Sequence, residues 1–131
     1  MPSFFEHVAA RLAHIHAKRV YARFVRALGD VDREQAAVLR RVLAQMADSD
    51  FGRRHGLRGV RTLEDLRRSV PLMTYEEYRP YIDRVSDGDT PALFAPGTRI
   101  LMFATSSGTT AQPKRIPVTP AFVADYRRGW N

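Results

Sequence analysis

The stretch that decides the fold covers residues 100–118 and reads ILMFATSSGTTAQPKRIPV. It begins with a short apolar run over 100–104 and continues into a polar cluster, which is typical of a buried strand that ends in a loop. A second, weaker strand is predicted at 115–118, where Pro117 favours a sheet edge or a bulge because proline has no backbone N–H to donate. The pattern therefore predicts two strands joined by a polar loop.

The loop between the two strands is dense in small hydrogen-bond donors, with the sequence TSSGTT over residues 105–110 and a lysine at position 114. Glycine allows a turn that exposes consecutive backbone N–H groups, and such a turn binds anions. The hydroxyl groups add donors, and Lys114 adds a point charge. This composition suits a polyphosphate, although ordinary surface turns share it. The loop differs from the GxxxxGK[ST] phosphate loop, because no glycine precedes Lys114.

The segment before this stretch is predicted to be helical in four places, beginning with two longer helices. Apolar residues recur at helical spacing from about Phe4 to Leu28. A second helix is predicted to open with Asp32 and Gln35 and to continue to Met46. Residues 51–59 are polar and punctuated by glycine, so we predict a loop there.

Two capping pairs mark the shorter helices. Thr62 with Asp65 begins one of them, and Thr74 with Glu77 begins the other. We expect the aromatic side chains of the second helix to pack in the protein rather than to stack on nucleic-acid bases. Pro80 lies inside this last pattern, which predicts a kink or two short helices. After the second strand, a further helix is predicted to open at residue 119 or 120.

The first predicted helix carries an excess of positive charge, which allows three interpretations. We favour a solvated basic face over a buried apolar stripe. The alternatives are a helix that lies on a membrane or directs targeting, and a helix that contacts nucleic acid. The cations concerned, against the single acid Glu6, are Arg11, Lys18, Arg19, Arg23 and Arg26.

The composition excludes several classes of protein. The chain has 131 residues, of which 44% are hydrophobic, so it can form a folded core. It has no cysteine, which excludes a disulfide scaffold and thiolate metal sites and fits a cytoplasmic location. The longest apolar run is five residues, far below the roughly 20 that a membrane span needs. The formal charge of +7 is carried by arginine except at Lys18 and Lys114, and it does not by itself indicate a nucleic-acid partner.

The loop and its flanks carry a family resemblance. Residues 106–114 resemble the phosphate-binding signature of adenylate-forming enzymes, which include acyl-CoA synthetases, peptide-synthetase adenylation domains and luciferases. Residues 70–85, VPLMTYEEYRPYIDRV, resemble the stretch before that loop in the auxin-responsive Gretchen Hagen family of acyl acid–amido synthetases. Residues 51–56, FGRRHG, and residues 116–117 fit the same family. The resemblance covers roughly residues 50–119.

This resemblance implies a fold and a chemistry. It implies an α/β fold in which residues 1–131 form the helix-rich N-terminal part of the large domain. It also implies ATP and Mg²⁺ as cofactors, with a carboxylic acid activated to an acyl-adenylate and then attacked by an amino acid to form an amide. Ala111 stands where the family usually has glycine or serine, and its methyl group disfavours a positive φ. By the same resemblance, the residues that line the ATP phosphates are Ser106, Ser107, Gly108, Thr109, Thr110 and Lys114.

The resemblance also bears on how much of an enzyme these residues contain. Members of the family are several times longer, so we expect residues 1–131 to be an N-terminal piece that holds no catalytic residue or metal ligand and is inactive alone. The expected partners are a small carboxylic acid and an amino acid, with no nucleic acid and no membrane span. The alternatives are a fragment of an acyl- or aryl-CoA ligase, and a basic helical module without enzyme activity that binds nucleic acid or a membrane surface.

Overall fold

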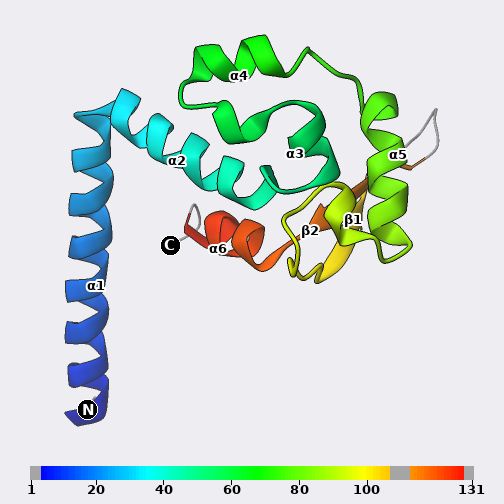
Figure 1. Ribbon diagram of the computed structural model, residues 1–131. Helices are drawn as coiled ribbons and strands as arrows, with labels where there is room; N and C mark the ends of the chain where they lie inside the picture. The colour runs from blue at the N-terminus through cyan, green and yellow to red at the C-terminus, as the bar shows by residue number, and fades with distance from the viewer. Residues whose placement is uncertain (1–3, 107–112, 129–131) are drawn as a thin grey trace.

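The computed structural model describes residues 4–106 and 113–128, and Figure 1 shows their arrangement. A long helix extends away from a body that contains the remaining elements. The described chain is helix-rich and has one antiparallel sheet of two strands, as the sequence predicts. The elements are α1 (Phe4–Leu28), α2 (Val31–Met46), α3 (Asp50–Arg54), α4 (Leu63–Ser69), α5 (Tyr75–Ser86), β1 (Met102–Thr105), β2 (Arg115–Val118) and α6 (Pro120–Arg128), with 3₁₀ turns at Leu57–Gly59 and Thr90–Ala92.

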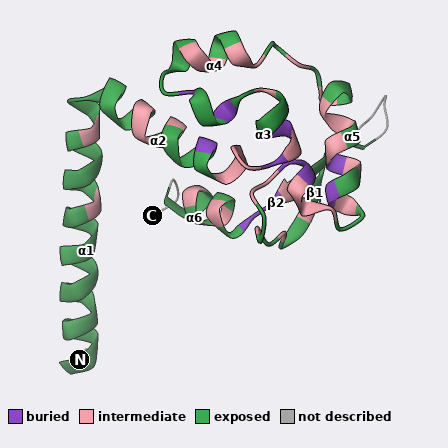
Figure 2. Cartoon of the chain, viewed as in Figure 1, coloured by how far each residue is buried: buried purple, intermediate pink, exposed green. Residues whose placement is uncertain are grey.

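The core lies where the end of α2, α3, α5 and the turn at Thr90–Ala92 meet. Figure 2 shows the buried residues gathered in this body. Phe51 is at its centre, with only 3% of its surface exposed, and its ring lies 5.5 Å from that of Tyr78 and 5.4 Å from that of Tyr81. The buried apolar cluster comprises Leu43, Phe51, Leu57, Val60, Ile82, Val85, Ala92 and Leu93.

Residues 51–59 are not a loop, so the prediction for this segment is wrong. They form most of α3 and the following 3₁₀ turn. The fully buried Ser49 caps α3, because its Oγ accepts from the Gly52 N–H at 2.9 Å and donates to the Met46 carbonyl at 2.7 Å. Burial of Phe51 then holds this short helix in place, which local composition does not reveal.

The predicted start of α2 is also corrected by two residues. Asp30, not Asp32, is the capping residue, and its carboxylate accepts from the Arg33 N–H at 3.1 Å. Asp32 lies in the first turn of the helix, where a negative charge interacts favourably with the exposed N–H groups. Both aspartates suit a helix start, so the sequence alone does not choose between them.

The two predicted capping pairs are confirmed. Thr62 and Asp65 form a reciprocal box at the start of α4. At the start of α5, the Glu77 carboxylate accepts from both the backbone N–H and the hydroxyl of Thr74, at 2.6 and 2.9 Å. Of the two alternatives predicted at Pro80, the pair of short helices is wrong, because α5 is assigned as one helix through the proline. Packing of Ile82 and Val85 in the core offsets the hydrogen bond that proline cannot make.

The capping box of α4 predicts a pH-dependent stability. The pKa of Asp65 is held far below its ordinary value of 3.8, by the Thr62 hydroxyl first, then by the Arg61 N–H and the Arg68 guanidinium. A depressed pKa stabilises the fold above the unfolded-state pKa, and this contribution is lost as the pH falls towards the folded-state value. We expect Asp65→Asn to lower the urea midpoint at pH 7 and to lower it less at pH 2.5, where part of this contribution is already lost. Equal losses at both pH values would contradict this account.

Both predicted strands are present and pair with each other, but β1 covers Met102–Thr105 rather than residues 100–104, and it is not buried. Ala104 is opposite Ile116 and Phe103 is opposite Pro117, so β2 lies at a sheet edge, as its proline indicates. Only Phe103 of β1 is half-buried, and 61% of Met102 is exposed. The apolar run predicts a strand with both faces covered, whereas in the described chain one face of this sheet has no layer packed on it.

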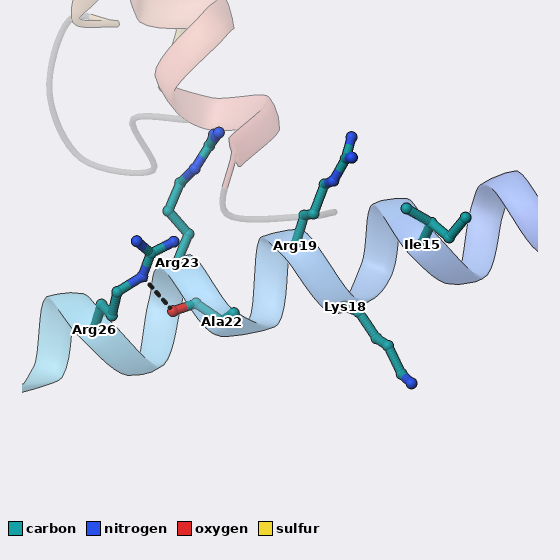
Figure 3. Close-up of a pocket in the computed structure, with 6 residues that line it drawn as sticks. All are labelled: Ile15, Lys18, Arg19, Ala22, Arg23 and Arg26. Carbon is teal, nitrogen blue, oxygen red and sulfur yellow. Dashed lines mark hydrogen bonds between the residues drawn. The ribbon is translucent and has the colours of Figure 1, made fainter.

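The apolar stripe of α1 is exposed, which contradicts the interpretation that we favour from the sequence. No residue of Phe4–Leu28 is buried, and Leu12 is 62% exposed. Figure 1 shows why, since most of α1 extends away from the rest of the chain. Figure 3 shows Arg19 and Arg23 projecting to one side of the helix and Lys18 to the other. The basic charges on this part of α1 therefore do not share one face.

Candidate functional site

The two ends of the predicted phosphate-binding loop are joined by hydrogen bonds. The Ser106 N–H donates to the Lys114 carbonyl at 3.0 Å, and the Lys114 N–H donates to the Ser106 Oγ at 3.2 Å. The first of these bonds continues the backbone ladder of β1 and β2 by one step beyond the pair of Thr105 and Arg115, whereas the second is made to the Ser106 side chain. The structure thus brings together the two described members of the predicted set. The other four, Ser107, Gly108, Thr109 and Thr110, lie outside the described residues, as does Ala111.

We call the hydrogen-bonded pair of Ser106 and Lys114 the neck of the loop. Tyr75, the first residue of α5, binds the backbone immediately after this neck. Its hydroxyl accepts from the Arg115 N–H at 2.8 Å and donates to the Arg115 carbonyl at 3.1 Å. One side chain therefore bonds both backbone polar groups of a single residue in β2. Because Tyr75 follows the capping residue Thr74 and is half-buried, it has a defined position from which to hold that strand.

The side chain of Arg115 makes a second connection between β2 and α5. Its guanidinium donates to the Ser86 hydroxyl at 2.7 Å and to the Asp83 carboxylate at 3.1 Å. Both partners lie near the end of α5, whereas Tyr75 lies at its start. The beginning of β2 is thereby attached along the length of this helix.

Charged groups gather around the ring of Tyr75. The Lys114 Nζ lies 5.5 Å from the ring centroid, and the Arg79 guanidinium carbon lies 5.0 Å from it. A cation near an aromatic face is attracted by the electron density of the ring. Glu76 accepts two hydrogen bonds from Arg79, at 2.6 and 2.8 Å. Arg79 first, and Lys114 by its charge, hold the pKa of Glu76 below its ordinary value.

The sequence predicts only part of this arrangement. It identifies Ser106 and Lys114, and it predicts that the tyrosines of α5 pack, as Tyr78 does against Phe51. It does not predict the two hydrogen bonds of the Tyr75 hydroxyl or the position of Lys114 beside its ring. The available signal is the place of Tyr75 directly after a helix cap, which fixes its backbone.

The donor set at the neck is suited to an anion. Ser106 contributes a hydroxyl, Lys114 contributes an ammonium group, and both side chains are exposed to solvent. Among residues 4–106 and 113–128, no group of three or more histidine, aspartate or glutamate side chains is arranged to hold a metal ion.

Comparison with known families shows which proteins this chain is similar to. The model of the GH3 family N-terminal domain matches residues 20–131, which include α2 to α6 and the whole neck region. The chain belongs to the GH3 family. The resemblance to the auxin-responsive acyl acid–amido synthetases is thereby confirmed. The part of α1 before residue 20 lies outside the GH3 match.

Three GH3 relatives illustrate the similarity. The chain is 42% identical over 88 residues to the probable indole-3-acetic acid-amido synthetase GH3.1 of Oryza sativa subsp. japonica, covering 66% of this chain and 14% of that protein. It is 38% identical over 109 residues to the jasmonoyl–L-amino acid synthetase GH3.3 of the same species, covering 82% and 23%. It is 33% identical over 90 residues to the indole-3-acetic acid-amido synthetase GH3.6 of Arabidopsis thaliana, covering 69% and 14%.

These GH3 proteins are much longer than the chain. The chain spans between 14% and 23% of the length of the three relatives. Two of them are named as indole-3-acetic acid-amido synthetases and the third as a jasmonoyl–L-amino acid synthetase. In the part of the chain that the structure describes, every helix is too short or too polar to cross a bilayer.

Proposed function

We propose that the chain supplies the phosphate-binding segment of an ATP-dependent acyl acid–amido synthetase. In this reaction a carboxylic acid attacks the α-phosphate of ATP, giving an acyl-adenylate and pyrophosphate. The amino group of an amino acid then attacks the acyl carbon, forming the amide and releasing AMP. Family membership and the neck formed by Ser106 and Lys114 support this proposal.

The proposed role of Lys114 follows from its charge and its place. Its ammonium group lies at the end of the hydroxyl-rich loop, within 5.5 Å of the Tyr75 ring centroid and exposed to solvent. Negative charge grows on the phosphates during in-line attack, and a fixed cation stabilises it. Ser106, together with Ser107 to Thr110 of the predicted set, would add neutral donors to the same phosphates. Mg²⁺, when bound, neutralises phosphate charge and would arrive with the nucleotide, because it retains waters and prefers phosphate oxygens.

The test is the binding of Mg·ATP and of Mg·pyrophosphate to the 131-residue chain, measured by isothermal titration calorimetry. Lys114→Ala is expected to weaken both by roughly 10- to 100-fold, the effect of removing one charge-assisted contact. The chain offers a matched control, because Lys18 is its one other lysine and lies on α1. Lys18→Ala is expected to leave both affinities unchanged.

Two outcomes would overturn the proposal. If Lys114→Ala binds as tightly as the wild type, Lys114 does not contact the phosphates. If both lysine variants lose affinity equally, the chain binds polyphosphate through its overall positive charge rather than at a site. We further expect the 131 residues to bind without forming an amide, since their GH3 relatives use several times more chain.

A further inference from the structure

The Tyr75 hydroxyl makes both of its hydrogen bonds to one residue of β2. It accepts from the Arg115 N–H and donates to the Arg115 carbonyl, so the peptide groups on both sides of Arg115 have fixed orientations relative to α5. One of these peptide groups joins Arg115 to Lys114. The direction in which the Lys114 side chain leaves the backbone therefore depends on the Tyr75 hydroxyl.

The Tyr75 ring acts on the other end of the same lysine. The Lys114 ammonium lies near the ring. The Arg79 guanidinium also lies over the ring, and the Glu76 carboxylate, which accepts two hydrogen bonds from it, balances its charge. The Tyr75 ring and the Glu76 carboxylate both attract the Lys114 ammonium, so together they favour its position on the side of the neck that faces α5. Tyr75 thus constrains Lys114 at its backbone and at its charged end.

We propose that Tyr75 is a positioning residue for Lys114, which it holds ready to meet the nucleotide phosphates. This inference rests on the proposed function. Tyr75 itself does not touch the phosphates in this scheme, and it acts by restricting the positions that the ammonium group samples. Preorganising a charged group in this way strengthens binding, because less freedom is lost when the ligand arrives.

A purely structural role is the competing explanation, and the structure separates the two. Arg115 connects β2 to α5 independently of Tyr75, through Asp83 and Ser86. Loss of the Tyr75 hydroxyl therefore leaves β2 attached to the helix. What it releases is the peptide group next to Lys114.

The experiment combines two variants of Tyr75 with one control. Tyr75→Phe removes both hydrogen bonds and keeps the ring, whereas Tyr75→Leu removes the ring as well. Tyr81→Phe is the matched control, because its hydroxyl lies on the same helix and accepts from Arg54, away from the neck. In the 131-residue chain, we expect Mg·pyrophosphate affinity to fall about three- to fivefold with Tyr75→Phe and more than tenfold with Tyr75→Leu. We expect no change with Tyr81→Phe.

A double-mutant cycle and hydrogen exchange show whether Tyr75 acts through Lys114. In a Lys114→Ala background, both Tyr75 variants are expected to have no further effect on affinity. The Arg115 amide, which loses its acceptor, is expected to exchange at least fivefold faster in Tyr75→Phe and at the wild-type rate in Tyr81→Phe.

The outcomes distinguish this inference from the proposed function. If Lys114→Ala abolishes binding while both Tyr75 variants bind normally, the positioning role is wrong and the phosphate site stands. If the loss caused by Tyr75→Phe persists in the Lys114→Ala background, Tyr75 acts structurally and the inference is wrong. If Lys114→Ala itself has no effect on affinity, the proposed function is wrong, and the positioning role that rests on it is wrong as well.

Discussion

Replacing Gly52 by alanine is expected to lower the free energy of unfolding by at least about 3 kcal/mol. The backbone conformation of Gly52 is ordinary, so the penalty comes from space alone. A Cβ at this position would overlap the Met46 carbonyl oxygen and lie 2.7 Å from the Ala47 carbonyl oxygen. Both are backbone atoms, and the Met46 carbonyl also accepts from Ser49. Relief of the overlap would therefore break the cap of α3.

The measurement is urea denaturation followed by circular dichroism, with Gly59→Ala as the matched control. Gly59 lies seven residues further along, and a Cβ there meets nothing within 4 Å. Its replacement is expected to change the free energy of unfolding by less than about 0.5 kcal/mol. A Gly52→Ala protein that cannot be refolded agrees with the expected loss. A folded variant whose urea midpoint matches that of Gly59→Ala would show that α3 can move away from the end of α2.

Local sequence signals were sufficient where a helix end is decided by neighbouring residues. The pairs Thr62 with Asp65 and Thr74 with Glu77 mark the starts of α4 and α5, because a cap needs only a side chain and a backbone donor three residues apart. The strand at residues 115–118 and its edge position were predicted for the same reason, since Pro117 cannot donate to a second neighbour.

Local signals failed where distant residues decide the structure. Segment 51–59 has the composition of a loop. It is helical because Phe51 packs against Tyr78 and Tyr81, some 30 residues later in the chain. The apolar residues of α1 and β1 predict burial, yet burial requires a second surface, which the described chain does not supply for these elements. Pattern alone shows that a face is apolar and does not show what covers it.

The same distinction applies to the candidate site. Ser106 and Lys114 could be identified because the hydroxyl-rich loop and its lysine are close in sequence. Tyr75 lies 40 residues before Arg115, so its two hydrogen bonds could not be read from either segment. Helix α5 is therefore the element that links the family-like stretch at 70–85 to the loop that follows it.

Truncation of Phe51 to alanine is the second change with a large expected effect, a loss of about 3–5 kcal/mol in the free energy of unfolding. The Phe51 ring is almost fully buried and lies 4.4 Å from the ring of His55 as well as against two tyrosines of α5. Its removal leaves a cavity between α3 and α5, the helix that carries Tyr75. Urea denaturation measures the loss, and we expect Phe51→Leu to cost less than about 1.5 kcal/mol because most of the volume is retained.

The control for Phe51 is Phe24→Ala on α1, where 61% of the residue is exposed. Removal of an exposed ring leaves no cavity, so the expected loss is below about 0.5 kcal/mol. A loss at Phe24 as large as that at Phe51 would mean that α1 is packed in solution and that its apolar stripe is covered. Equal and small losses at both positions would mean instead that Phe51 does not organise the core. Only a large loss confined to Phe51 supports a core built around α3 and α5 with α1 outside it.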